Sequence, residues 1–549
     1  MTRWIAAAVA ALTMALPATA APDPEVVVQA RPPGYMLDLA KAFSRKAAGE
    51  VGLEEFQKTL ETKLGEKGFT GLDMLRPIAA YAHLDAKFEQ SWIVAVVPIT
   101  DEKEFIALGE RLKLTAKPVA GKAGLYAIAP TGDDVPGDLP IRLRFHDRHA
   151  YLGYNAKDDV LDAKALVPVA KLVDPAEAGL VAVRLDGAKL DPAAKKLALE
   201  KVEGLIAEGM QLAGTGPGGD ALSAVLKAIS TFAKDIVADG QSATGRLLAT
   251  PKSVEVGYEI ELVGKPDSKL AKGIAAYKPT LNRFAGFMTP DAVAGGVMTA
   301  PLIAPELRDG LAAVFAGLAK EGLPDIANFW KTLEVFQPVL KVAFGVLAKS
   351  AKENSLHAGV ALFGPHDDGL YTAIAGLTVA DPRGVEKALR EALPKAPKEE
   401  IQDTVKLDAF KVGEVSVHTI LVDPYVPPQV QEIQKVFGNT AKLHVAFGPD
   451  AIFFAIGPKA VEELTRAIAL KPQAAKLLEM NAHSKRILNL VKLAGGDEAA
   501  KGFEAVLGTD DEMVSINTLE VEGGTRLRVR YTAWSGSWYV PGMMFFGGL

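Results

Sequence analysis

Two segments of this chain share one pattern, in which an apolar strand leads through an aspartate into an amphipathic helix. Residues 91–100, SWIVAVVPIT, form a β-branched run that predicts a buried strand, and the helical pattern DEKEFIALGERLKL follows from Asp101. Residues 369–380, GLYTAIAGLTVA, form a second such run, and DPRGVEKALREAL follows from Asp381. Aspartate is a favourable helix N-cap, and apolar residues then recur at helical spacing on one face. The repetition predicts that one structural unit occurs twice.

The correspondence between the two halves extends beyond these segments. Each half has an apolar segment upstream that predicts a hairpin partner strand, residues 78–84 and 356–363. Each half also closes with alternating strands, residues 253–264 and 513–534. Five further pairs of segments match in order: strand 124–130 with 411–422, strand 141–145 with 442–447, strand 150–155 with 452–457, helix 158–166 with 460–468, and strand 179–185 with 485–491.

The duplication and the mixture of strands and helices predict an α+β fold. We expect two domains, each a mixed or antiparallel sheet with helices packed on it. The first α+β repeat domain is expected to comprise residues 21–287 and the second residues 288–534. A signal peptide (residues 1–20) precedes them in this prediction, and an apolar C-terminal tail (residues 535–549) follows.

The N-terminal residues have the pattern of a secretory signal peptide. Arg3 gives a positive charge, residues 5–16 form an apolar run, and small residues at 18–20 form a cleavage site. An uncleaved N-terminal anchor is the alternative. The chain has no cysteine, which excludes disulfides, thiolate metal sites and a cysteine nucleophile, and which is typical of a bacterial envelope protein. We therefore expect an exported protein, periplasmic or extracellular.

Charge and hydropathy argue against two classes of interaction. The formal net charge is −6, and the lysines and arginines are scattered along the chain, so nucleic acid is not an expected partner. After the N-terminal run, the most apolar segment is residues 301–320, which carries Glu306, Arg308 and Asp309. A helix that crosses a membrane needs about 20 largely apolar residues, so no transmembrane span is expected.

One string of residues carries a resemblance to a known kind of protein. A turn, the apolar strand AYLGYN (residues 150–155) and the short helical pattern DDVLDAKAL (residues 158–166) follow one another. This order resembles a motif of uncharacterised secreted bacterial proteins built of tandem α+β repeats, a family of unknown function. The resemblance implies an exported, duplicated architecture, and it implies no activity, catalytic residue or cofactor.

Two clusters of histidine and aspartate are the candidate metal ligands. His146 and His149 lie in RFHDRHAYLGYN between two predicted strands, and the matching turn of the second half, GPDA, has no histidine. His366, Asp367 and Asp368 lie in GPHDDG, whose glycines and proline are typical of a turn. Imidazole and carboxylate groups bind zinc or calcium when a further ligand converges on them. The spacing favours a plain turn at both places, and no metal or cofactor is expected.

The sequence lacks the familiar catalytic motifs. The glycine-rich GTGPGG (residues 214–219) is not followed by the Lys-Ser or Lys-Thr of a phosphate-binding loop. Neither a G-x-S-x-G elbow nor an H-E-x-x-H motif occurs. These observations favour a protein that is not an enzyme.

The C-terminal tail is the strongest candidate for contact with a partner. Residues 535–549 are apolar without a helical or strand period, so the tail either packs on its own domain or meets a partner protein or a membrane surface. The residues expected to make such a contact are Trp534, Trp538, Tyr539, Met543, Met544, Phe545 and Phe546.

Together these patterns favour an exported, non-enzymatic envelope protein with a binding or scaffolding role. Two alternatives remain open. Long helices rich in alanine, leucine and valine, such as residues 222–240 and 329–353, suit a carrier or chaperone that holds an apolar ligand or lipid between helix and sheet. A hydrolase whose residues converge only in three dimensions is the second alternative. An enclosed apolar cavity with a mouth favours the carrier, and a concave pocket with a converging His-Asp or carboxylate pair favours the enzyme. Solid cores with a flat apolar surface between the domains or at the tail favour the scaffold.

Overall fold

A computed structural model describes residues 24–85, 90–131, 140–212, 226–227, 230–231, 233–250, 255–277, 281–299, 305–321, 336–399, 401–421, 432–438, 442–507 and 513–534. The predicted signal peptide, the glycine-rich residues 214–219 and the tail 535–549 lie outside these residues. The chain divides into two compact units. Unit 1 comprises Met1–Lys201, Asp235–Ala271 and Thr525–Arg528, and unit 2 comprises Val202–Lys234, Lys272–Gly524 and Val529–Leu549.

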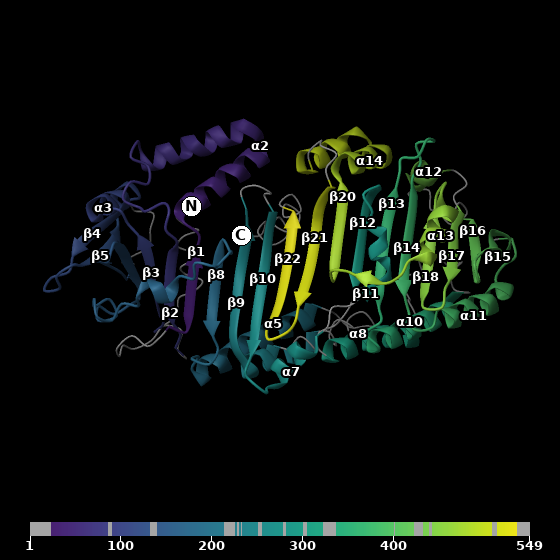
Figure 1. Ribbon diagram of the computed structural model, residues 1–549, viewed down its shortest axis with the longest axis horizontal. Helices are drawn as coiled ribbons and strands as arrows, with labels where there is room; N and C mark the ends of the chain where they lie inside the picture. The colour runs from purple at the N-terminus through teal and green to yellow at the C-terminus, as the bar shows by residue number, and fades with distance from the viewer. Residues whose placement is uncertain are drawn as a thin grey trace. The chain divides into compact units, whose positions relative to one another are not determined.

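Unit 1 is built on an antiparallel sheet with the strand order β4-β5-β6-β7-β3-β2-β1-β8-β9-β10 (Figure 1). The strands are β1 (Val26–Ala30), β2 (Ile78–His83), β3 (Trp92–Pro98), β4 (Leu114–Pro118), β5 (Leu125–Pro130), β6 (Ile141–His146), β7 (His149–Tyr154), β8 (Val181–Asp186), β9 (Gly240–Ala249) and β10 (Glu255–Gly264). The helices are α2 (Pro33–Leu64), α3 (Glu102–Arg111) and α4 (Val169–Leu172). Two more helices, α5 (Pro192–Leu212) and α7 (Lys269–Ala276), have residues in both units.

Unit 2 is also built on an antiparallel sheet, with the order β15-β16-β17-β18-β14-β13-β12-β20-β21-β22 (Figure 1). The strands are β12 (Ala292–Thr299), β13 (His357–Phe363), β14 (Thr372–Thr378), β15 (Val405–Val412), β16 (Val415–Leu421), β17 (Lys442–Phe447), β18 (Ala451–Ile456), β20 (Leu478–His483), β21 (Met513–Glu522) and β22 (Leu527–Trp534). The short strands β11 (Leu281–Asn282) and β19 (Gln473–Ala474) pair separately. The helices are η1 (Arg283–Phe287), α8 (Pro305–Glu321), α10 (Gln337–Lys352), α11 (Pro382–Ala392), η3 (Leu393–Lys395), η4 (Gln402–Thr404), α12 (Glu432–Phe437), α13 (Ala460–Ala469) and α14 (Ser484–Leu507).

The predicted α+β class is confirmed, because helices accompany a large antiparallel sheet. The sequence left open whether each sheet is mixed or antiparallel. All strand pairs whose register is described are antiparallel. As expected, none of the helices among the described residues is both long enough and apolar enough to cross a membrane.

Both helices that were predicted to begin after an aspartate are present. The carboxylate of Asp101 accepts a hydrogen bond from the backbone N–H of Glu104 at 2.9 Å, at the start of α3. The carboxylate of Asp381 accepts one from the backbone N–H of Gly384 at 2.8 Å, at the start of α11. These bonds satisfy backbone donors that the first turn of a helix leaves unpaired.

The two faces of the unit 1 sheet bury separate clusters of side chains. Tyr81, Val94 and Tyr151 pack on one face. Leu143 and Ala150 lie on the other, where α3 covers them. Successive strand residues point to opposite faces, so an uninterrupted apolar run such as β3 serves both clusters.

Aromatic packing against glycine organises the centre of unit 2. Phe284 and Phe287 of η1 are fully buried, and Phe284 packs edge-on against Phe453 with ring centroids 6.0 Å apart. A Cβ atom added to Gly359 or Gly376, on β13 and β14, would collide with Phe284. The two glycines therefore provide the space that the ring of Phe284 fills.

One predicted helix is wrong. Residues 158–166 form a series of turns, in which the backbone N–H of Asp162 donates to the carbonyl of Asp159. The carboxylate of Asp158 accepts a hydrogen bond from Arg142 of β6 at 3.1 Å and so holds the start of the segment to the sheet. Aspartate side chains that bond locally compete with a regular helix, and this segment has three of them in five positions.

One predicted strand is also wrong. Residues 485–491 lie in α14, and the strand at this place in the chain is β20. The helical spacing of Ile487 and Leu490 places both side chains against the buried core of unit 2, which a strand assignment misses. The sequence of β20, LEMNAH, alternates apolar and polar residues, but it has no β-branched residue and includes Glu, Asn and Ala, which are depleted in strands, so its strand signal is weak.

We expect Gly376→Ala to destabilise unit 2 by about 1–3 kcal/mol, because the new methyl group overlaps the buried ring of Phe284. Gly245→Ala is the matched control, since a Cβ at this β9 position meets no atom within 4 Å. The measurement is urea unfolding of both variants. Equal stabilities of the two variants would contradict the packing described here.

Candidate functional site

The first pair of candidate histidines lies at a tight turn between β6 and β7. Asp147 and Arg148 form the turn with positive φ angles of 48° and 56°, as in a type I′ hairpin. His146 is exposed, whereas His149 is buried and its Nδ1 donates to the backbone carbonyl of Asp147 at 2.7 Å. Burial lowers the pKa of His149. One nitrogen of His149 is therefore already used by the turn that the sequence favours.

The second candidate cluster also forms a turn, between β13 and β14. The backbone N–H of His366 donates to the carbonyl of Leu370 at 2.8 Å, and the carboxylate of Asp368 accepts from the N–H of Leu370 at 3.0 Å. The ring Nε2 of His366 lies 2.9 Å from the hydroxyl of Thr372. Asp367 is exposed in the same turn. The polar groups of His366 and Asp368 thus hold the turn, and the structure does not bring Asp367 together with them as a ligand set.

Of the residues predicted to contact a partner, only Trp534 is among the described residues, as the last residue of β22. The other six belong to the tail and lie outside the described part of the chain.

One group of potential metal ligands converges in unit 2, and the sequence analysis did not single it out. Glu386 of α11, Asp408 of β15 and His418 of β16 bring one ligand atom each within 4.8 Å of the others. The side chains of Glu386 and His418 are 7% and 0% exposed. Arg390, one turn after Glu386, donates to both carboxylates at 2.7 Å.

The hydrogen bonds of this group already occupy its ligand atoms. The backbone N–H of Asp408 donates to Nδ1 of His418 at 3.0 Å, so the ring proton is on Nε2, which donates to Glu386 at 3.3 Å. The second oxygen of Glu386 accepts from Arg383 at 2.7 Å. We interpret the group as a partly buried ion network that fixes α11 on the β15–β16 hairpin, because a metal would have to displace the guanidinium groups.

The pKa values of Asp408, Glu386 and His418 are all lowered in the folded chain, but the causes differ. Hydrogen bonding and the charge of Arg390 lower the pKa of Asp408. Burial alone would raise the pKa of Glu386, but the bonds and charges of Arg390 and Arg383 outweigh it and lower this pKa. Burial and the charge of Arg390 lower the pKa of His418, against the opposing effect of both carboxylates. The network is therefore stable with two anionic carboxylates and a neutral imidazole.

A second ion network lies on the sheet of unit 1, and it includes Arg526 and Arg528, which belong to unit 1 although β22 continues into unit 2 from Val529. Its members are Glu177, Arg246, Glu259, Glu261, Arg526 and Arg528. Arg246 of β9 lies 2.9 Å from Glu259 and 3.5 Å from Glu261, both on β10. Glutamates and arginines alternate in space, so each buried charge has an opposite neighbour, as buried charges require. This arrangement stabilises the pairing of strands and leaves little free charge for a ligand.

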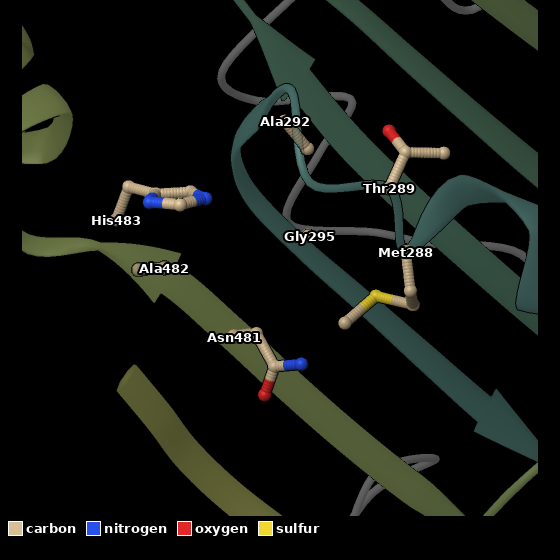
Figure 2. A pocket seen from close by; sticks show the side chains of 7 residues that line it. All are labelled: Met288, Thr289, Ala292, Gly295, Asn481, Ala482 and His483. Atoms are coloured by element: carbon tan, nitrogen blue, oxygen red, sulfur yellow. The ribbon is translucent and has the colours of Figure 1, made fainter. Parts of the chain in front are cut away.

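Two hollows in the structure are poor ligand sites. Figure 2 shows the first, in unit 2, where Asn481 and His483 of β20 and Met288 lie around Gly295 of β12. Its volume is about 10 Å³, which is room for about one water molecule.

The second hollow, in unit 1, has a volume of about 350 Å³ and a polar lining. Both carboxylates of its lining are paired within the protein. Glu25 is paired with His83, and Asp186 lies 3.3 Å from Lys189. A cationic ligand group would have to compete with these pairs.

An apolar cavity of about 180 Å³ lies in unit 1 between α3 and strands β4–β7. Its lining consists of apolar side chains and one glycine, contributed by the helix and by all four strands. The lining residues are Phe105, Ile106, Leu108, Gly109, Leu112, Leu114, Ala116, Ile128, Leu143 and Leu152. The cavity is partly open to solvent.

The cavity exists because positions that face it carry small side chains. Phe105 and Gly109 of α3 and its C-cap residue Leu112 face the cavity, and Gly109 adds no side chain between the other two. Ala116 of β4 is similarly small. A Cβ atom at residue 109 would make only ordinary contact, 3.6 Å from the carbonyl oxygen of Leu114, so close backbone packing does not require glycine there. A glycine on the apolar face of a predicted helix is the sequence feature that could have indicated this site. Glycine there lowers the stability of the helix by about 1 kcal/mol relative to alanine.

Comparison of the chain with models of protein families, with curated protein sequences and with solved structures gave no match. The functional interpretation therefore begins from the geometry of the cavity.

We expect Arg390→Met to destabilise unit 2 by about 2 kcal/mol, because the buried carboxylate of Glu386 loses a charge-assisted hydrogen bond. Lys387→Met on the same helix is the control, since Lys387 is 79% exposed and its contact with Glu391 is 4.0 Å long. The control should change stability by less than about 0.5 kcal/mol. Urea unfolding measures both variants, and equal effects would contradict the proposed anchoring of α11.

The unfolding free energy is expected to fall as the pH is lowered from about 7.5 to about 5.5, in part because of His418. The pKa of His418 is lowered in the folded chain, so the unfolded chain binds more protons in this range and acid favours unfolding. His418→Gln keeps one donor and one acceptor but does not titrate. Urea unfolding at a series of pH values should show a shallower slope for this variant, and an unchanged slope would exclude His418 as a cause.

Proposed function

We propose that this protein is a non-enzymatic binding protein, and that unit 1 holds an apolar group of a ligand in the cavity between α3 and β4–β7. The cavity is the observation that carries this proposal. The cavity is partly open to solvent, measures about 180 Å³ and has an apolar lining, and ligand sites are concave and lined mainly by apolar side chains. An enclosed void of about 150 Å³ lined by leucine, isoleucine and phenylalanine binds benzene or xenon, which makes xenon a suitable probe for an apolar lining of this kind.

The lining supports binding without chemistry. All side chains that line the cavity are hydrocarbons, so the site offers a ligand dispersion contacts and exclusion of water. The converging polar groups of unit 2, Glu386, Asp408 and His418, are held by arginine and by each other. The geometry of the cavity therefore supports the carrier alternative best.

The proposal includes an internal duplication of one α+β unit. The ten strands of each unit occur in the same chain order along its sheet, with the unit's third strand paired to its seventh in both. The hydrogen bond from the N–H of Ile99 to the carbonyl of Arg148, at 3.1 Å, has a counterpart from Val379 to Asp450 at 3.0 Å. The two aspartate-capped helices, α3 and α11, occupy the same place in this order.

Equivalence of α3 and α11 explains why only unit 1 would bind a ligand. Matching Asp101 to Asp381 matches Gly109 to Leu389 and Ile106 to Glu386. Leu389 packs against the apolar cluster of unit 2, and Glu386 belongs to the ion network. The space that stays open in unit 1 is thus filled in unit 2.

Export to the periplasm or the cell exterior is part of the proposal. Its support is the N-terminal pattern of Arg3, the apolar residues 5–16 and the small residues 18–20. Outside the cytoplasm, an apolar group is exposed to water unless a protein or a membrane covers it, so a carrier has a clear physical role there.

Xenon is expected to bind to the native chain and to lose its site in unit 1 when Gly109→Leu fills the cavity. Leucine suits a helix better than glycine, so the variant should be at least as stable. Gly204→Leu in α5 is the control, because a Cβ there meets no atom within 4 Å. The measurement is the xenon chemical shift during titration with each protein. Identical titrations of the native chain and Gly109→Leu would refute the proposed site.

A further inference from the structure

We propose that the C-terminal residues 535–549 bind to an exposed apolar face of the unit 2 sheet. This open face consists of Gly296 and Met298 of β12, Val360 of β13 and Met480 of β20. The inference goes beyond the proposed function, because it concerns unit 2 and a contact within the chain. It is carried by the exposure of this face, by its composition and by the place where β22 ends.

The open face is continuous across three neighbouring strands. Gly296 lies opposite Val360 on one side and opposite Met480 on the other, so the three residues form a row. A Cβ atom added to Gly296 would lie 3.4 Å from Met480 and 3.8 Å from Val360. Met298 points to the same face, because it is two residues from Gly296. Met298, Val360 and Met480 are 46%, 50% and 41% exposed, and a group of exposed apolar neighbours marks a contact surface.

Helices cover the same face of the sheet on two sides of the open face. Towards the outer strands, Leu377 of β14 and Phe454 of β18 pack with α10. Towards the end of β13, Leu362 packs with Ile487 and Leu490 of α14. The open face lies between these two contacts and keeps its apolar side chains in water, which is unfavourable.

The row of the open face continues to β22, the strand that precedes residues 535–549. Met480 lies opposite Asn517 of β21, so both side chains point to one face. The hydroxyl of Tyr531, on β22, donates to the side-chain oxygen of Asn517 at 2.5 Å, and Figure 1 shows β22 beside β21. β22 ends at Trp534, three residues after Tyr531. The segment therefore begins close to this row.

Residues 535–549 are long enough to cross the open face. Neighbouring strands lie about 4.8 Å apart, so Val360, four strands from β22, is about 19 Å away. An extended chain advances about 3.3 Å per residue, so about six residues reach Val360. The segment is attached to the same unit, and attachment gives it an effective concentration at the open face that a separate partner rarely reaches.

The segment and the open face match in chemistry. Residues 535–549 have no charged side chain, and they include four aromatic residues and two methionines. The open face has no charged side chain either, and it presents Met298 and Met480, whose sulfur atoms make favourable contacts with aromatic rings. Contact between the two removes apolar surface of both from water.

A disulfide test in the full chain is possible because the chain has no native cysteine. Gly548→Cys is combined with Val360→Cys on the open face or with Val461→Cys as the matched control. Val461 is 46% exposed and lies on α13, which packs on the opposite face of the sheet. In a glutathione buffer, the disulfide within one chain should form about tenfold more readily at residue 360, the factor that burial of one apolar side chain supplies.

A second measurement needs no cysteine. Val360→Lys places a charge on the open face, so residues 535–549 should become about tenfold more accessible to chymotrypsin, as mass spectrometry of the cleaved chain measures. Val461→Lys is the control and should leave the rate of this cleavage unchanged.

Three outcomes would overturn the inference. In the first, residues 360 and 461 form the disulfide equally well and both lysine variants are cleaved at the native rate. In the second, the disulfides join two molecules, which would assign the segment to a second copy of the chain. In the third, the native chain binds vesicles of phosphatidylcholine and phosphatidylglycerol, and deletion of residues 535–549 abolishes this binding, which would assign the segment to a membrane surface.

Discussion

Each unit depends on the burial of apolar side chains on both faces of its antiparallel sheet. On β3, Ile93 and Val94 are adjacent, point to opposite faces, and are 4% and 0% exposed. A sheet with this pattern must be covered on both sides, because exposure of the apolar side chains of either face to water is unfavourable. In unit 1, α3 covers one face of the outer strands, and the turns of residues 158–166 with α4 cover the other. The site follows from this requirement, since it lies where the cover on one face is incomplete.

The sequence predicted correctly those helices and strands whose capping residues and apolar spacing match the contacts that they make in the fold. The strand runs before Asp101 and Asp381 and the capped helices after them were recoverable, because cap and apolar spacing point the same way. The strand β20 and the turns of residues 158–166 were not, because tertiary contacts decide their conformation against weak or contrary local signals. The same limit applies to sites. Asp408 and His418 meet Glu386 only through the pairing of β15 with β16 and the packing of α11, which no spacing in the sequence reveals.

The space beneath a helix that lies on a sheet is filled in two different ways in this chain. Under α11, charged groups occupy it, and each charge is balanced by a neighbour at hydrogen-bond distance. Under α3, the wall is wholly apolar, and a glycine leaves part of the space empty. The first arrangement fixes the helix rigidly in direction, because hydrogen bonds are directional. The second relies on dispersion contacts, which another apolar molecule can replace at small cost.

The position of Asp408 has a consequence for association between molecules. Its φ angle is 49°, and the register of β15 against β16 shifts between Lys406 and Phe410, so the strand is bulged. Among the described strands, β15 pairs on one side only, and a straight free edge is a template for strands of other molecules. A bulge breaks the repeat of donors and acceptors, and exposed lysines such as Lys406 add charge to the edge. The bond from Asp408 to buried His418 that helps to seat α11 therefore also protects this sheet from edge-to-edge aggregation.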